Sequence, residues 1–184
     1  MGVVLVGGAV GWLVAGRGGG GAQPVRHTAV IPQAFGAYRE AKAGDNEWPE
    51  YASPNTDVSK GEAYLTYRAS GGRAMAIDVK LDPVAYTADD GTRIGPGSDN
   101  DTTSLLGISD AGIARSYPGP RQGGEIQCAA PTYSGVTITT CAWQSKAAEI
   151  TYTPFLNHRA VVSATAQNDF RSFLDALVIK PATS

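Results

Sequence analysis

The stretch AYLTYRASGGRAMAIDVKL, residues Ala63–Leu81, decides the fold of this chain. Apolar and polar residues alternate on both sides of its glycine pair, which is the period-two pattern of strands with one buried face. A three-residue loop at Ser70–Gly72 would place Leu65 opposite Ile77, both on the buried face. A two-residue loop would instead place Leu65 opposite Asp78. We therefore predict a β-hairpin with the three-residue loop.

The only two cysteines of the chain fall in a second predicted hairpin, formed by EIQCAA and VTITTCAW. If its turn is centred on Ser134–Gly135, Cys128 lies directly opposite Cys141. Opposed residues have Cα atoms about 4.5–5.5 Å apart, within the range of a disulfide. We predict this bond, which indicates a compartment outside the reducing cytosol. Two alternatives stay open: a pair of buried thiols, and a cysteine that binds metal or acts in catalysis.

The C-terminal third adds a strand and a helix to these hairpins. Glu149–Thr153 alternates again and predicts a strand beside the cysteine hairpin, ended by Pro154. Apolar residues then recur at steps of three and four, which predicts an amphipathic helix over Ala160–Val178, with Pro181 beyond it. We predict an α+β fold: an antiparallel sheet of about five strands, packed by the C-terminal helix and carrying one disulfide. The apolar face of the helix comprises Val162, Ala166, Phe170, Phe173, Leu174 and Leu177.

The N-terminal segment Gly2–Gly16 contains no charged residue. As a helix it would span about 22 Å, short of the ~30 Å hydrocarbon core, and a start upstream of Met1 would explain this. We interpret residues 1–16 as a membrane anchor or a signal segment, with cleavage before Gln23 in the second case. A buried element of a cytosolic protein is the third alternative. Residues 17–30 are then a Gly-rich flexible tether, and residues 31–184 form the extracytoplasmic domain.

The sequence assigns no catalytic, cofactor-binding or metal-binding residue. A net charge of −2 argues against a nucleic-acid partner. His27 is expected to be exposed in the tether, and His158 is expected to be a polar residue at the entry to the helix. Asp99–Asp101 could supply oxygen ligands to calcium, but no glutamate closes an EF-hand loop, so we expect a solvated loop. Neither a Gly-x-Ser-x-Gly elbow nor a Ser-x-x-Lys motif occurs.

A dinucleotide-binding fingerprint is matched in letters by the glycines at 16, 18 and 21. That fingerprint works only when an amphipathic helix follows it, so that the helix N-terminus meets the pyrophosphate. The residues after Gly21 have no helical period. We therefore interpret the match as an accident of a glycine tract.

Three short segments together resemble a known group of proteins. They are Ile31–Tyr38, the Pro-Gly-Gly-Cys-like segment Pro118–Cys128, and the Cys-Ala-Trp segment Thr140–Trp143. The set is similar to single-pass or secreted envelope proteins of high-GC actinobacteria that have no assigned function. The resemblance implies an envelope topology and a disulfide, and no reaction. Residues Gln144–Ala148 depart from the Ala-Asp that often follows Cys-Ala-Trp in that group, so no role for that aspartate transfers.

These observations support a function hypothesis only at the level of class. The leading hypothesis is a membrane-anchored or secreted envelope protein with a non-enzymatic ectodomain for sensing, scaffolding or binding. Its partners would be the membrane, through the N-terminal segment, and an envelope protein or cell-wall ligand. The alternative is a small extracytoplasmic hydrolase whose site is assembled across loops, and a third hypothesis is a secreted solute-binding or inhibitor-like module. Because a catalytic triad is set by geometry, a cleft that joins His158 to a serine and a carboxylate would favour the hydrolase.

Overall fold

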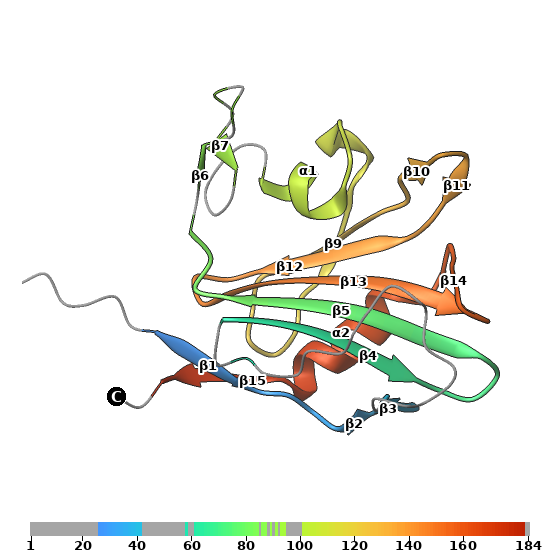
Figure 1. The fold of residues 1–184 in the computed structure, drawn as a ribbon, viewed down its shortest axis with the longest axis horizontal. Coiled ribbons are helices and arrows are strands. Elements are labelled where there is room, and N and C mark those ends of the chain that lie inside the picture. Colours follow the sequence, from blue (N-terminus) through green and yellow to red (C-terminus); the bar gives the residue numbers. More distant parts are fainter. Residues whose placement is uncertain are drawn as a thin grey trace, which may run out of the picture.

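The computed structural model describes residues 26–41, 58, 61–84, 86–87, 89, 91, 93–94 and 101–182. The described residues are mostly β, with 47 % strand and 16 % helix, and most of their strands form one large antiparallel sheet (Figure 1). The predicted α+β class with about five strands is therefore wrong. The sequence pattern marked the long strands, but short edge strands carry too few residues to show a period.

The main sheet has nine strands. In spatial order they are β2 (Ala34–Phe35), β3 (Tyr38–Glu40), β4 (Glu62–Arg68), β5 (Arg73–Leu81), β13 (Ala148–Leu156), β12 (Thr140–Gln144), β9 (Glu125–Ala129) and β8 (Arg115–Pro118), with β14 (Arg159–Ala160) paired to β13.

Smaller elements surround this sheet. Three two-stranded ribbons pair β1 (His27–Val30) with β15 (Val178–Pro181), β6 (Tyr86–Thr87) with β7 (Arg93–Ile94), and β10 (Thr132–Tyr133) with β11 (Val136–Thr137). The helical elements are α1 (Asp101–Leu106), the 3₁₀ turn η2 (Ala111–Ile113) and α2 (Ala166–Ala176).

The register predicted for the first hairpin is confirmed. Leu65 pairs with Ile77, and Tyr67 pairs with Met75. The Ala69 N–H donates to the carbonyl oxygen of Arg73 at 2.8 Å, which leaves the three residues 70–72 as the loop. Burial of one strand face is sufficient to fix this register, because a slip of one residue would exchange the two faces.

The cysteine hairpin is also confirmed. Cys128 pairs with Cys141 across β9 and β12, and a disulfide joins the two residues. The bond lies among the buried apolar residues on the inner face of the sheet, where Cys141 is completely buried. The tip of the hairpin turns at Ser134, as predicted, through the separate short ribbon of β10 and β11.

Strand β13 continues through Pro154, so the prediction that this proline ends the strand is wrong. Pro154 lies opposite Met75 of β5, and its carbonyl oxygen accepts a hydrogen bond from the Val161 N–H on the opposite side, at 3.1 Å. In a strand the N and O atoms of one residue point to the same side. The missing N–H of Pro154 therefore faces away from β5, and no hydrogen bond of that ladder is lost.

The C-terminal helix is shorter than predicted, because α2 begins only at Ala166. Arg159 and Ala160 instead form β14, which folds back onto β13 through a turn at Asn157 and His158. Val162 is exposed, whereas the other predicted apolar positions of the helix are buried: Ala166, Phe170, Phe173, Leu174 and Leu177. The chain after α2 pairs with β1, which satisfies backbone groups that a longer helix would have used.

The described part of the predicted tether, residues 26–30, contains strand β1. His27 belongs to β1, its N–H donates to Asp82 Oδ2 at 2.7 Å, and its Nδ1 lies 2.5 Å from Asp82 Oδ1. The prediction that His27 is an exposed tether residue is therefore wrong. Burial acts to raise the pKa of the Asp82 carboxyl, but the hydrogen bonds and charge of His27 outweigh it and hold that pKa below its usual value.

The anchor or signal segment 1–16 lies outside the described residues. Among the residues that the structure does describe, none of the helices has the length and apolar character needed to cross a membrane.

The two faces of the main sheet are covered differently. Helix α2 packs on the inner face, where Phe173 contacts the rings of Phe35 and Tyr67. Helix α1 lies over the outer face, where the Thr102 hydroxyl donates to the side chain of Gln127 on β9 (Figure 1). The hydrophobic core therefore lies between the sheet and α2, and the outer face carries more polar side chains.

Candidate functional site

Three cavities on the described part of the chain are lined by polar side chains. The sheet cavity has a volume of about 190 Å³ and lies beneath α1. The hairpin cavity, of about 360 Å³, lies between the β4–β5 loop and the β13–β14 turn. The α2 cleft, of about 270 Å³, lies between β13, the segment before α2, and the first turn of that helix.

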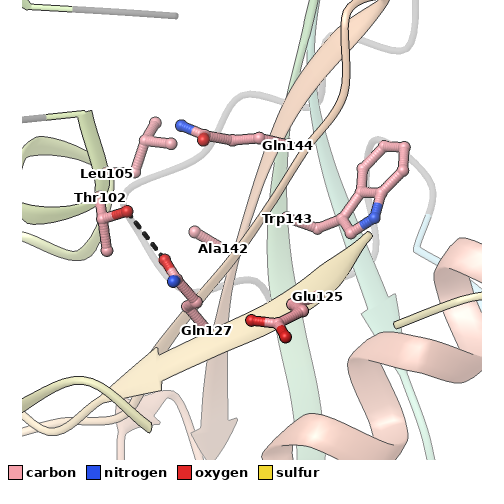
Figure 2. A pocket seen from close by; sticks show the side chains of 7 residues that line it. All are labelled: Thr102, Leu105, Glu125, Gln127, Ala142, Trp143 and Gln144. Carbon is pink, nitrogen blue, oxygen red and sulfur yellow. Dashed lines mark hydrogen bonds between the residues drawn. The ribbon is translucent and has the colours of Figure 1, made fainter. Parts of the chain in front are cut away.

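The sheet cavity is polar but small. Figure 2 shows the hydroxyl of Thr102 bonded to Gln127 at 2.8 Å, with Gln144 beside Leu105 and the ring of Trp143 projecting away from them. The Gln144 amide nitrogen is buried and has no hydrogen-bond partner. The cavity is the smallest of the three and lies directly beneath α1, so we interpret it mainly as the contact that docks that helix.

The hairpin cavity contains His158, the residue on which the hydrolase alternative depends. His158 lies in the β13–β14 turn with a φ of 66°, not at a helix entry as predicted. Ser70 lines the same cavity, but the described residues of its lining include no carboxylate. A Ser-His-Asp arrangement is therefore not brought together around His158 by the described residues.

The α2 cleft combines an apolar wall with a polar floor. Its wall contains Phe155, Val161 and Val162, and its floor includes the hydroxyl-bearing side chains of Tyr38 and Tyr152. An apolar cleft with a few converging polar groups is the usual form of a ligand site.

The Tyr152 hydroxyl is the exceptional group of this cleft. Tyr152 is 1 % exposed, and its ring stacks on Phe170 with a centroid distance of 5.4 Å. Its hydroxyl oxygen is buried without a hydrogen-bond partner. Burial raises the pKa of this phenol far above its usual value, and the nearby Asp169 charge adds to the effect. Tyr152 therefore lines the cleft with a neutral donor that is itself buried, and the unmade hydrogen bond costs about 1–3 kcal/mol.

The charges of Asp169 and Arg73 both act on that hydroxyl. Asp169 accepts hydrogen bonds at its Oδ2 from the Tyr38 hydroxyl at 3.3 Å and from the Thr165 hydroxyl at 3.1 Å. The Arg73 guanidinium lies over the Tyr38 ring, 5.5 Å from its centroid. Burial, followed by the Asp169 charge, raises the pKa of Tyr38 as well. The cleft thus offers a fixed carboxylate, a cation and an unpaired phenol beside an apolar surface.

Outside these cavities, the carboxyl of Asp78 has an environment unlike that of an exposed acid. It lies on the outer face of β5, opposite Tyr64 and Thr151. The pKa of its carboxyl is raised to about 6. Burial is the main cause, the Glu62 charge acts in the same sense, and the Lys80 charge acts in the opposite sense. No histidine, serine or cysteine lies opposite it in the register, so it is not part of an assembled triad within the described strands.

Asp78 gives a testable pH dependence. Because its folded-state pKa exceeds the unfolded value of 3.8, the folded protein binds this proton more tightly, and stability from this group is lost as the pH rises through about 6. We expect Asp78→Asn to be more stable than the wild type by about 1–2 kcal/mol at pH 8, after allowance for solvent screening, with the difference vanishing near pH 4. Urea unfolding at both pH values measures this, with the exposed-site variant Asp89→Asn as control. An equal difference at both pH values would contradict the assignment.

No candidate metal centre occurs in the described part of the chain, in the sense of three or more His, Cys, Asp or Glu side chains close together. Asp99 and Asn100, named above as potential calcium ligands, lie outside the described residues, and Asp101 begins α1. The cleft residues Tyr38, Tyr152 and Asp169 escaped the sequence analysis, because a tyrosine in an alternating strand and an acid on the polar side of a helix resemble ordinary structural residues.

Comparison with family models, with curated proteins and with solved structures found no match for this chain.

Proposed function

We propose that this chain is a non-enzymatic ectodomain of an envelope protein, which binds a small amphipathic ligand in the α2 cleft. In this proposal the domain is held outside the cytoplasmic membrane by the segment 1–16, or is secreted after cleavage near Ala22. The ligand would be a component of the envelope or the cell wall.

The location is supported by the Cys128–Cys141 disulfide, because cytosolic reductants keep most protein thiols reduced. The resemblance to actinobacterial envelope proteins and the uncharged segment Gly2–Gly16 point the same way. These are independent indications, since the disulfide register depends on the hairpin and not on the N-terminal segment.

The binding role depends on one observation: a completely buried Tyr152 hydroxyl that lacks a partner in a cleft with an apolar wall. A core position needing only bulk would be filled better by phenylalanine, which carries no desolvation penalty. The hydroxyl is explained if a ligand supplies the missing acceptor. Such a ligand has an apolar part that covers Val161 and Phe155 and a hydrogen-bond acceptor that reaches Tyr152.

The variant Tyr152→Phe separates a binding role from a structural one. It removes only the hydroxyl, so we expect the free energy of unfolding to stay unchanged or to rise by about 1 kcal/mol. In amide NMR spectra, amphipathic fragments should shift wild-type resonances around Thr165 and Asp169. These shifts should require at least about fivefold more ligand in Tyr152→Phe.

Tyr117→Phe is the matched control, because it removes a phenol hydroxyl from β8 and does not alter the lining of the cleft. It should bind the fragments as the wild type does. A Tyr152→Phe protein that is destabilised by more than about 1 kcal/mol, or that binds every fragment normally, would reject the proposed function.

A further inference from the structure

Basic side chains gather at one end of the main sheet, around the β4–β5 loop. Arg39 lies directly opposite Arg68 across β3 and β4. Arg73 and Arg159 both pair with Leu156, one from each side. His158 occupies the adjoining turn. This concentration of positive charge contrasts with the net charge of −2 of the whole chain.

Arg39 and Arg68 place two like charges directly opposite each other. Like charges directly opposed across a strand pair destabilise a sheet. Among the described residues, no carboxylate lies within salt-bridge distance of the guanidinium groups of Arg39, Arg73 and Arg159. The fold concentrates cations here, and among the described residues three of them have no carboxylate partner, which favours the attraction of an anion.

The hairpin cavity lies within this basic end. Arg68, Arg73 and His158 line it, together with the neutral hydrogen-bonding side chains of Ser70 and Asn157. Its volume of about 360 Å³ makes it larger than the α2 cleft. Guanidinium groups beside amide and hydroxyl groups are the usual combination for recognising phosphate oxygens.

The walls of the cavity are fixed by contacts between its two loops. The Asn157 N–H donates to the Gly72 carbonyl oxygen at 2.9 Å. Gly71 and Gly72 have φ angles of 73° and 71°, and a Cβ on Gly72 would collide with the side-chain oxygen of Asn157. The two loops are therefore joined closely, and the polar side chains that they carry are held at the same rim.

We propose that the hairpin cavity is a binding site for a phosphoryl group, either of a soluble phosphate ester or of an anionic lipid headgroup. Arg68 and Arg73, which the register places on opposite faces of the sheet, would approach the anion from two sides. His158 would contact it from the turn, and Arg39 and Arg159 would add to the attractive field. The hairpin cavity shares Arg73 with the α2 cleft, whereas Arg68, Ser70 and His158 line the hairpin cavity and not the cleft. Each of the two proposals can fail without the other.

The test compares the full chain with two double variants of equal charge. Arg68→Gln/Arg73→Gln removes two cations from the cavity, and Arg115→Gln/Arg171→Gln removes two cations from β8 and α2. One arm titrates inorganic phosphate and follows the amide resonances of residues 70–73 and 157–158. The second arm measures co-sedimentation with vesicles of phosphatidylcholine, with and without 30 % phosphatidylglycerol. Circular dichroism and thermal unfolding verify that each variant is folded.

We expect phosphate to shift those resonances in the wild type and in the Arg115/Arg171 variant, with affinity reduced at least tenfold in the Arg68/Arg73 variant. Phosphate binding without any dependence on phosphatidylglycerol assigns the site to a soluble phosphate ester. Vesicle binding that requires phosphatidylglycerol and is lost only in the Arg68/Arg73 variant assigns it to a lipid headgroup. If neither ligand binds, or if the two double variants lose binding equally, the site does not exist. Should the Arg68/Arg73 variant fail to fold, the single variant Arg73→Gln, whose side chain is exposed, takes its place with a threefold or greater loss expected.

Discussion

Replacing Phe173 with alanine is expected to lower the free energy of unfolding by about 3–5 kcal/mol. Phe173 is completely buried, and its ring lies 5.5 Å from that of Phe35 and 5.6 Å from that of Tyr67, measured between centroids. The truncation removes the contact through which α2 covers β2 and β4, and the rigid strands around it cannot close the resulting cavity. Urea-induced unfolding followed by circular dichroism measures the loss.

Ser172→Ala is the control for this prediction, since it changes an exposed position on the same helix. It should alter the free energy of unfolding by less than about 0.5 kcal/mol. If Phe173→Ala lost no more stability than this control, α2 would not be packed on the sheet as the structure describes.

Removing the disulfide is expected to cost about 3 kcal/mol, because the bond closes a short loop and restricts the unfolded chain. The two cysteines are 13 residues apart in sequence. The double variant Cys128→Ala/Cys141→Ala should unfold at a correspondingly lower urea concentration than the oxidised wild type, at pH 7.

The reduced wild type is the control for the disulfide, because it retains both sulfur atoms. It should lose nearly as much stability as the double variant, the remainder coming from the packing of the two sulfurs. If reduction left the unfolding transition unchanged, the bond would contribute nothing to the fold.

The two hairpins could be predicted from the sequence because local physics fixes them. In the first, the alternation of apolar residues selects the register that places Leu65 opposite Ile77, and a slip would expose the buried face. In the second, a turn centred on Ser134–Gly135 places Cys128 opposite Cys141. The buried face of α2 was predictable for the same reason, since a spacing of three and four residues marks one side of a helix.

The remaining features depend on contacts between distant segments. Pairing of β1 with β15, and of β13 with β5, joins residues that no local pattern connects. Val162 continued the helical spacing by coincidence, because Ala160 of β14 is paired with Phe155 of β13. The helical pattern therefore predicted a first turn that the short β13–β14 hairpin replaced.

The candidate sites were hidden from the sequence for a related reason. Tyr152 and Asp169 are 17 positions apart and come close together only because α2 packs on β13, so no sequence motif predicts the cleft. The basic end of the sheet likewise joins Arg39, Arg68 and Arg159 from three strands. A buried tyrosine is the signal that could have been followed, since a phenol hydroxyl in a core needs a partner.

The proposed location and function depend most on maturation of this protein in an oxidising compartment. Cells of the source organism are quenched in acid, their free thiols are blocked with a mass-tagged alkylating reagent, and the protein is recovered from membrane, secreted and cytosolic fractions. We expect Cys128 and Cys141 to carry no tag in protein recovered from the membrane or the medium. Two tagged cysteines in protein recovered from the soluble cytosol would contradict the location and the proposed function together.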